Sequence, residues 1–167
     1  MNADSLREVH IHDNWIKGEA IDKLAEFLLK ATKLEVLNFS DSTMGTDGAV
    51  FVVKALSQSE SRKTLRHLAC NFNDIETSSA SKFILELILT SGFEILETVE
   101  FRGNTLPKKV AVAYATKLQE KGCKLLYKED DEEEDEEEDL DEDEEEVEEG
   151  EPIDEEDITS KLAKLML

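Results

Sequence analysis

The chain has 167 residues, with 41 acidic residues against 19 Lys and Arg, and its formal net charge is −22 at pH 7. Residues 129–157 contain 24 of these acids and no base, whereas residues 1–128 contain 17 of each sign. This neutral body has the length of one domain. No run approaches the roughly 18 apolar residues of a membrane span. A basic excess for nucleic acid is also missing, so membrane-spanning and nucleic-acid-binding proteins are disfavoured.

Motifs typical of metal sites and of enzyme active sites are missing from the sequence. Cys70 and Cys123 lack C-x-x-C spacing and have no Cys/His cluster around them, which argues against a zinc site. There is no G-x-S-x-G elbow, glycine-rich phosphate loop or H-E-x-x-H motif. We therefore predict no catalytic residue, no metal, no cofactor and no enzyme activity of the chain itself. The polar start is unlike a signal peptide, so we expect reduced thiols.

Four segments share the pattern L-x-x-L-x-L-x-x-N-x-L, with other apolar residues allowed at the Leu positions. They begin at Leu6, Leu34, Leu65 and Leu96, which gives spacings of 28, 31 and 31 residues. The alternation of apolar residues predicts a short strand in each. The polar position after the strand can bond buried backbone groups inside a turn. It is occupied by Asn14, Ser42, Asn73 and Asn104, and the serine predicts that the second turn is the weakest.

A helical pattern follows each turn, with apolar residues spaced along residues 21–28, 50–56, 83–88 and 110–118. A full helix per repeat and a period near 30 residues are typical of the long, ribonuclease-inhibitor-like leucine-rich repeats. The predicted fold over residues 1–128 is therefore an α/β horseshoe, with a parallel curved sheet inside and helices outside. Residues 125–127 are a candidate partial closing strand.

The first repeat begins close to the start of the chain, without a polar capping element. We expect its apolar residues to be partly uncovered, with marginal stability or self-association as a result. Either a partner covers this edge, or further repeats precede it; the second explanation is preferred. The residues concerned are Val9, Ile11, Trp15, Ile16 and Ile21.

The C-terminal segments differ from the body. Residues 129–152 are almost all Asp and Glu, which predicts a disordered acidic tail. Residues 153–167 place acids first and lysines last, which suits a short amphipathic helix. Two interpretations of this helix stay open: docking on the horseshoe or fraying, and a nuclear export signal. The export-like spacing is carried by Ile158, Leu162, Leu165 and Leu167.

The concave face of the predicted sheet carries the side chains that flank the strand cores, and the turns add a rim. We expect a polar protein-binding surface there rather than a metal site, because His67 lies two strands, roughly 10 Å, from the other histidines. Arg102 has two interpretations: an arginine supplied to a partner's phosphoryl transfer, or a concave-face arginine that pairs with Glu100. The candidate partner-binding residues are His10, His12, Asp13, Asn38, Ser40, Asp41, His67, Asn71, Glu100 and Arg102. Cys70 occupies a core position and is expected to be buried.

Several segments carry a family resemblance. Residues 34–41, followed by Gly48-Ala49-Val50, resemble a repeat of the Ran GTPase-activating protein family. Residues 96–97 and 103–106 are similar to that family's final repeat, which is likewise followed by an uninterrupted acidic tract. The resemblance covers residues 6 to about 149; single repeats are weakly specific, and their order with the tail moderately so.

The resemblance implies a regulator of GTP-bound Ran in nucleocytoplasmic transport, located in the cytoplasm or at the nuclear envelope. In that family the crescent holds Ran while the GTPase's own glutamine orients water, and no arginine finger is supplied. The resemblance also makes Ran-binding proteins, an export receptor or other basic proteins candidate partners of the acidic tail. The family's crescent has about twice as many repeats, with its main effect residues in the N-terminal half, so weak activity or none is expected of this chain.

A second class joins a small horseshoe to an acidic tail. Acidic leucine-rich nuclear proteins act as histone chaperones or phosphatase regulators, and they are the alternative interpretation. Their repeats are nearer 22–24 residues, which the observed spacing disfavours. A scaffold without any link to a GTPase is a third possibility.

Overall fold

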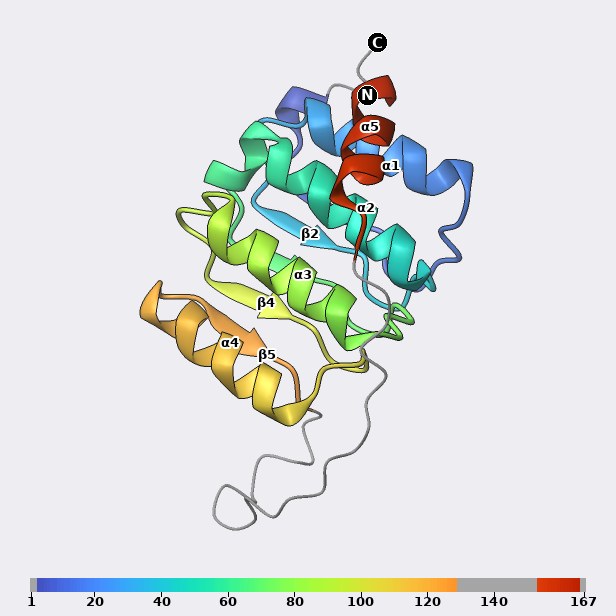
Figure 1. Cartoon of the computed structure of the whole chain (residues 1–167). Coiled ribbons are helices and arrows are strands. Elements are labelled where there is room, and N and C mark those ends of the chain that lie inside the picture. Colours follow the sequence, from blue (N-terminus) through green and yellow to red (C-terminus); the bar gives the residue numbers. More distant parts are fainter. Residues whose placement is uncertain (1–2, 129–152, 166–167) are drawn as a thin grey trace.

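A computed structural model describes residues 3–128 and 153–165 (Figure 1). Strands and helices alternate through the body, as the repeat pattern predicts. The acidic segment 129–152 lies outside the described residues. In chain order the elements are a 3₁₀ turn η1 (Ala3–Ser5), β1 (Glu8–His10), α1 (Glu19–Lys30), β2 (Val36–Asn38), α2 (Gly45–Gln58), η2 (Glu60–Lys63), β3 (His67–Ala69), α3 (Ser78–Thr90), β4 (Thr98–Glu100), α4 (Lys108–Glu120), β5 (Lys124–Leu126) and α5 (Glu155–Leu165).

The five strands form one parallel sheet in the order β1-β2-β3-β4-β5. The middle residues of the strands pair in a single row: Val9, Leu37, Leu68, Val99 and Leu125. Helices α1 to α4 lie on one face of this sheet (Figure 1). The predicted α/β fold is confirmed, and the partial closing strand is β5, displaced by one residue from the expected stretch 125–127.

The core lies between the sheet and the helices. Leu37, Leu68 and Val99 are fully buried beneath the helix row, because alternate strand residues point to that face. Each of α1, α2 and α3 contributes several buried residues, whereas α4 buries only Ala111 and Leu118. Among the described residues, no helix is long and apolar enough to cross a membrane.

The polar turn residues bind the backbone of neighbouring repeats. The Asn104 side-chain amide donates to the carbonyls of Cys70 (3.0 Å), Phe101 and Arg102, while its Oδ1 accepts from the Asn73 N–H (3.1 Å). Asn73 likewise donates to Phe39 and Asn71 carbonyls. These bonds link adjacent repeats and confirm the predicted role of the asparagines.

In the second turn a serine hydroxyl takes the place of the asparagine amide. The Ser42 hydroxyl donates to the carbonyls of Ile11 at 3.2 Å or Ser40 at 3.3 Å. Two buried side-chain oxygens have no partner among the described residues. Thr43 Oγ1 belongs to this turn, and Asn73 Oδ1 belongs to the matching turn of the next repeat. Thr43 also has a positive φ of 46°. A serine therefore supplies less bonding here than an asparagine does, as the sequence predicts.

The first repeat is partly covered. Val9, Ile11, Ile16 and Ile21 are half-buried and pack against the core, whereas Trp15 is 85% exposed. Helix α5 supplies part of this cover, because it lies across α1 and α2 on the outer side (Figure 1). The expected apolar exposure is thus concentrated at Trp15.

Candidate functional site

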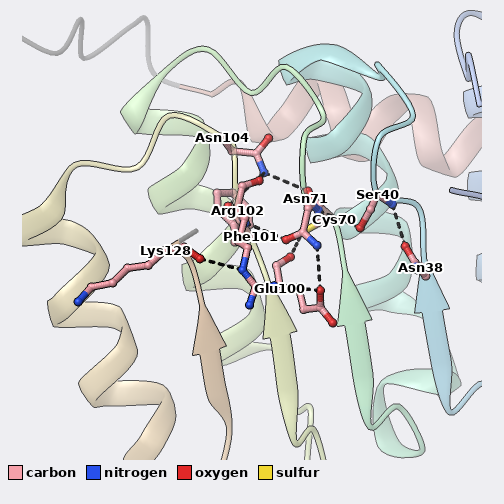
Figure 2. A network of polar contacts seen from close by, with 9 residues as sticks. All are labelled: Asn38, Ser40, Cys70, Asn71, Glu100, Phe101, Arg102, Asn104 and Lys128. Carbon is pink, nitrogen blue, oxygen red and sulfur yellow. Dashed lines mark hydrogen bonds and ion pairs between the residues drawn. The ribbon is translucent and has the colours of Figure 1, made fainter. Parts of the chain in front are cut away.

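Five of the expected partner-binding residues form one hydrogen-bonded array at the carboxyl ends of β2, β3 and β4 (Figure 2). We call this array the polar network: Asn38, Ser40, Asn71, Glu100 and Arg102. Asn38 Oδ1 accepts from the Ser40 N–H at 2.9 Å, and Ser40 Oγ accepts from the Asn71 N–H at 3.1 Å. The network therefore crosses three repeats without a break.

Asn71 is the central member of the polar network. Its Nδ2 donates to Glu100 Oε2 at 2.8 Å, and its Oδ1 accepts from the Arg102 N–H at 2.8 Å. Asn71 is only 8% exposed. A buried amide with both ends bonded holds its neighbours in fixed positions, so this part of the concave face is ordered before any partner arrives.

Acceptors that hold Arg102 include a backbone carbonyl and a carboxylate. Its Nε donates to the Lys128 carbonyl at 2.8 Å, and its Nη1 lies 3.4 Å from Glu100 Oε2. The interpretation in which Arg102 pairs with Glu100 is therefore observed. The contact with Lys128 joins the end of the body to the polar network (Figure 2).

The histidines separate into two places. His10 Nε2 lies 3.3 Å from Glu8 Oε2, His12 Nδ1 lies 3.0 Å from Asp13 Oδ2, and the two rings are 6.5 Å apart. We call these four residues the histidine cluster; it occupies the first repeat. His67 lies on β3, where its nearest carboxylate is that of Glu97 at 3.7 Å. Among the described residues, no group of His, Cys, Asp or Glu has metal-site geometry.

The rim carries an exposed aromatic side chain, Phe72, which is not among the expected site residues. Asp13, Asp41 and Phe72 occupy matching positions after β1, β2 and β3, and all three have positive φ. Aspartate tolerates that conformation, whereas a bulky side chain is strained by it. Phe72 is nevertheless 45% exposed. Its exposure could not be derived from the repeat pattern, although its rim position could.

The two thiols are protected by burial. Burial is the main cause that raises the pKa of Cys70 far above its usual range, and the Glu100 charge adds to it. Burial also raises the pKa of Cys123 to about 11. Both thiols stay protonated at neutral pH, so neither is an activated nucleophile. The expectation that Cys70 is a buried core thiol is confirmed.

Comparisons with known proteins support the fold. No family model matches the chain, and no curated protein matches it. Among solved structures, "Leiomodin-1 Actin-Binding Site 2 (ABS2)" is similar, with a TM-score of 0.56 and 18% sequence identity over 77% of this chain and 74% of that chain. At this identity the likeness concerns the fold alone. The chain thus has a leucine-rich-repeat-like α/β fold of five parallel strands alternating with helices.

Proposed function

We propose that the chain is a protein-binding module that holds a partner against its concave face, and that this partner is the small GTPase Ran in its GTP-bound state. The observation that carries the first part is the polar network. Polar side chains from three repeats are already fixed by hydrogen bonds, so a partner surface meets them at little cost in conformational entropy. Leucine-rich-repeat solenoids use such concave surfaces for binding.

The choice of Ran rests on the resemblance of four short segments to the Ran GTPase-activating protein family, together with the acidic tract that follows. These segments are residues 34–41, 48–50, 96–97 and 103–106. The chain would act by positioning the GTPase's own catalytic groups. Arg102 fits this role better than that of an inserted arginine, because its guanidinium is bound to Lys128 and Glu100. A cytoplasmic regulator of nuclear transport is the physiological role that we propose.

The alternative is an acidic leucine-rich nuclear protein that binds histones or regulates a phosphatase. Full helices of 12 to 14 residues occur in all four repeats, and these favour the long-repeat class over it. The similar solved structure is, by its name, an actin-binding site of leiomodin-1. Core histones and actin are therefore the competing ligands in a binding test.

The experiment measures the affinity of the full chain for four ligands: GTP-loaded Ran, GDP-loaded Ran, core histones and actin. The proposal predicts a preference for GTP-loaded Ran. Glu100→Lys should weaken that binding by about tenfold or more, because the charge reversal breaks the polar network. Glu120→Lys makes the same charge change on the exposed end of α4 and should have little effect. Binding of histones or actin in preference to Ran would contradict the proposal.

A second readout is the rate of GTP hydrolysis by Ran. Because the family's main effect residues lie in repeats that these 167 residues do not match, we expect at most weak stimulation by this chain. Binding without stimulation agrees with the proposal. Strong stimulation would show that the repeats of this chain contain the activating groups themselves.

A further inference from the structure

A groove on the outer side of the molecule holds the C-terminal helix. Helices α1 and α2 approach closely there, since Gly48 has no side chain; a Cβ at this position would lie 2.7 Å from Ile21 Cδ1. Between these helices and the segment that begins α5 is a cavity of about 540 Å³. The body contributes Ile21, Val50 and Phe51 to its walls, and the C-terminal segment contributes Ile153 and Ile158. We call the α1–α2 surface the outer groove.

Helix α5 is attached to the outer groove mainly through one buried side chain. Leu162 is 1% exposed, whereas Ile158 and Leu165 are only half-buried. The cavity beside Ile158 leaves part of the outer groove unfilled by α5. The residues that line this part lack some of the dispersion contacts that close packing provides. The apolar contact is therefore centred on Leu162 and is incompletely packed beside Ile158.

One ion pair joins α5 to the body, and a second pair lies within the helix itself. Lys54 Nζ lies 3.1 Å from Glu155 Oε2 and 5.7 Å from the centre of the Phe83 ring, and the Lys54 side chain is 13% exposed. Lys161 pairs with Asp157 at 2.6 Å. The hydrogen bond with Asp157 is the main cause that raises the Lys161 pKa. The charges of the body residues Asp47 and Asp22 also raise it, so they attract Lys161 toward the groove. The charges thus fit the helix to this groove.

The helix needs a surface in order to stay folded. Asp154 Oδ1 accepts from the N–H groups of Glu156 and Asp157, each at 3.0 Å, which caps the N-terminus. Even a capped helix of 11 residues is marginal in water, so α5 is stable only against an apolar partner. Its covalent connection to the body keeps the outer groove available at high effective concentration.

We propose that the outer groove is a binding site for amphipathic helices, and that α5 occupies it in cis as a reversible latch. The latch withholds the apolar face formed by Ile158, Leu162 and Leu165 from any other protein while the helix is docked. A partner that takes this helix into an apolar groove of its own needs the same Leu162 side chain. Docked and partner-bound states therefore exclude each other. This inference does not depend on what the concave face binds.

The latch is tested first by charge reversal in the full chain. Glu155→Lys removes the contact with Lys54, and hydrogen exchange of the α5 amides should accelerate by about tenfold or more. The double variant Lys54→Glu with Glu155→Lys should restore slow exchange. Glu156→Lys makes the same charge change at an exposed position on the same helix and serves as the control. Equal acceleration in both single variants, or none in Glu155→Lys, overturns the latch.

The groove itself is tested with a labelled peptide of residues 153–167 added in trans. Leu162→Asp in the full chain empties the outer groove without altering the body. The peptide should bind this variant about tenfold or more tightly than it binds the wild-type chain, whose groove is occupied. A peptide carrying the same Leu162→Asp change should not bind. The Glu155→Lys chain, with an open latch, provides a second receptor. Equal affinity for all chains, or binding to none, overturns the proposal.

Discussion

The Phe72 ring rests directly on Gly103, so closely that a Cβ at position 103 would overlap the ring atoms. Both residues have positive φ, 51° for Phe72 and 64° for Gly103. Glycine adopts this conformation without steric cost, and here it also makes room for the aromatic ring of the preceding repeat. The two residues together place an exposed aromatic side chain on the rim, next to the polar network.

Gly103→Ala should destabilise the body by about 2 kcal/mol, because the new Cβ meets the ring and the left-handed conformation disfavours alanine. Phe72→Ala removes the obstacle, so the double variant should lose less than the two single losses added together. Thermal or urea unfolding of the four proteins gives the coupling energy. Strict additivity would show that the ring and the glycine are independent.

Phe72→Ala should also weaken partner binding at the concave face. An exposed aromatic side chain beside a fixed polar array is the kind of residue that dominates protein interfaces, so a loss of about 2 kcal/mol is expected. Because the ring is nearly half exposed, the variant should keep most of its stability. Titration with GTP-loaded Ran measures the effect. Trp15→Ala, at the exposed aromatic residue of the first repeat, shows whether that end of the rim contributes as well.

Asn104→Ala should cost about 2–4 kcal/mol of stability, because it removes a hydrogen-bond partner from three carbonyls and two N–H groups of adjacent repeats. Asn14→Ala removes the matching residue of the first repeat, which is exposed and donates only to Ile11 and His12. Water can replace these bonds, and the expected cost is about 1 kcal/mol or less. Equal costs in denaturant unfolding would contradict the inter-repeat role of Asn104.

Alkaline pH should destabilise the fold through its thiols. An unfolded thiol loses its proton near pH 8.5, whereas burial holds the Cys123 pKa at about 11. Between these values the unfolded state binds fewer protons than the folded state, so the free energy of unfolding falls as pH rises. Cys123→Ala should flatten that fall, which melting temperatures from pH 8 to 11 would reveal. A slope that is unchanged in the variant would assign the effect to other groups.

Partner association should depend on salt if the acidic residues contribute. Residues 129–152 carry dense negative charge in the sequence, and exposed charges are screened beyond about 8 Å at physiological ionic strength. Replacing these residues with an uncharged Gly/Ser linker of equal length keeps α5 tethered. Association rates should then fall at low salt and match those of the wild type at high salt. Unchanged rates at low salt would leave the tract with a solubilising role only.

The repeat pattern predicted the body because each of its signals is local. The L-x-L alternation placed Leu37 and Leu68 in the core, and the polar position after it placed Asn73 and Asn104 in the turns. Five of the expected site residues came together because register in a parallel sheet follows from the repeat itself. His67 did not join them, because it is the first residue of β3 and lies at the amino ends of the strands, beside Glu97.

Other features depend on contacts between distant segments. The outer groove that holds α5 includes Ile21 and Lys54, which precede the helix by about 100 residues or more. No periodicity in the sequence encodes the fit between these residues and α5. Sequence spacing left docking and an export signal equally open. The structure docks the helix and buries Leu162, while the last residue of the export-like pattern, Leu167, lies outside the described residues. Whether the segment functions in export stays a prediction.

The measurement that tests the central claim most directly is hydrogen exchange of the full chain with and without saturating GTP-loaded Ran. Binding through the concave face predicts slower exchange at the carboxyl ends of β2, β3 and β4 and in the rim around Phe72, with unchanged exchange on the outer faces of α3 and α4. Protection confined to the outer helices, or no protection at any concentration that saturates a specific complex, would contradict this mode of binding.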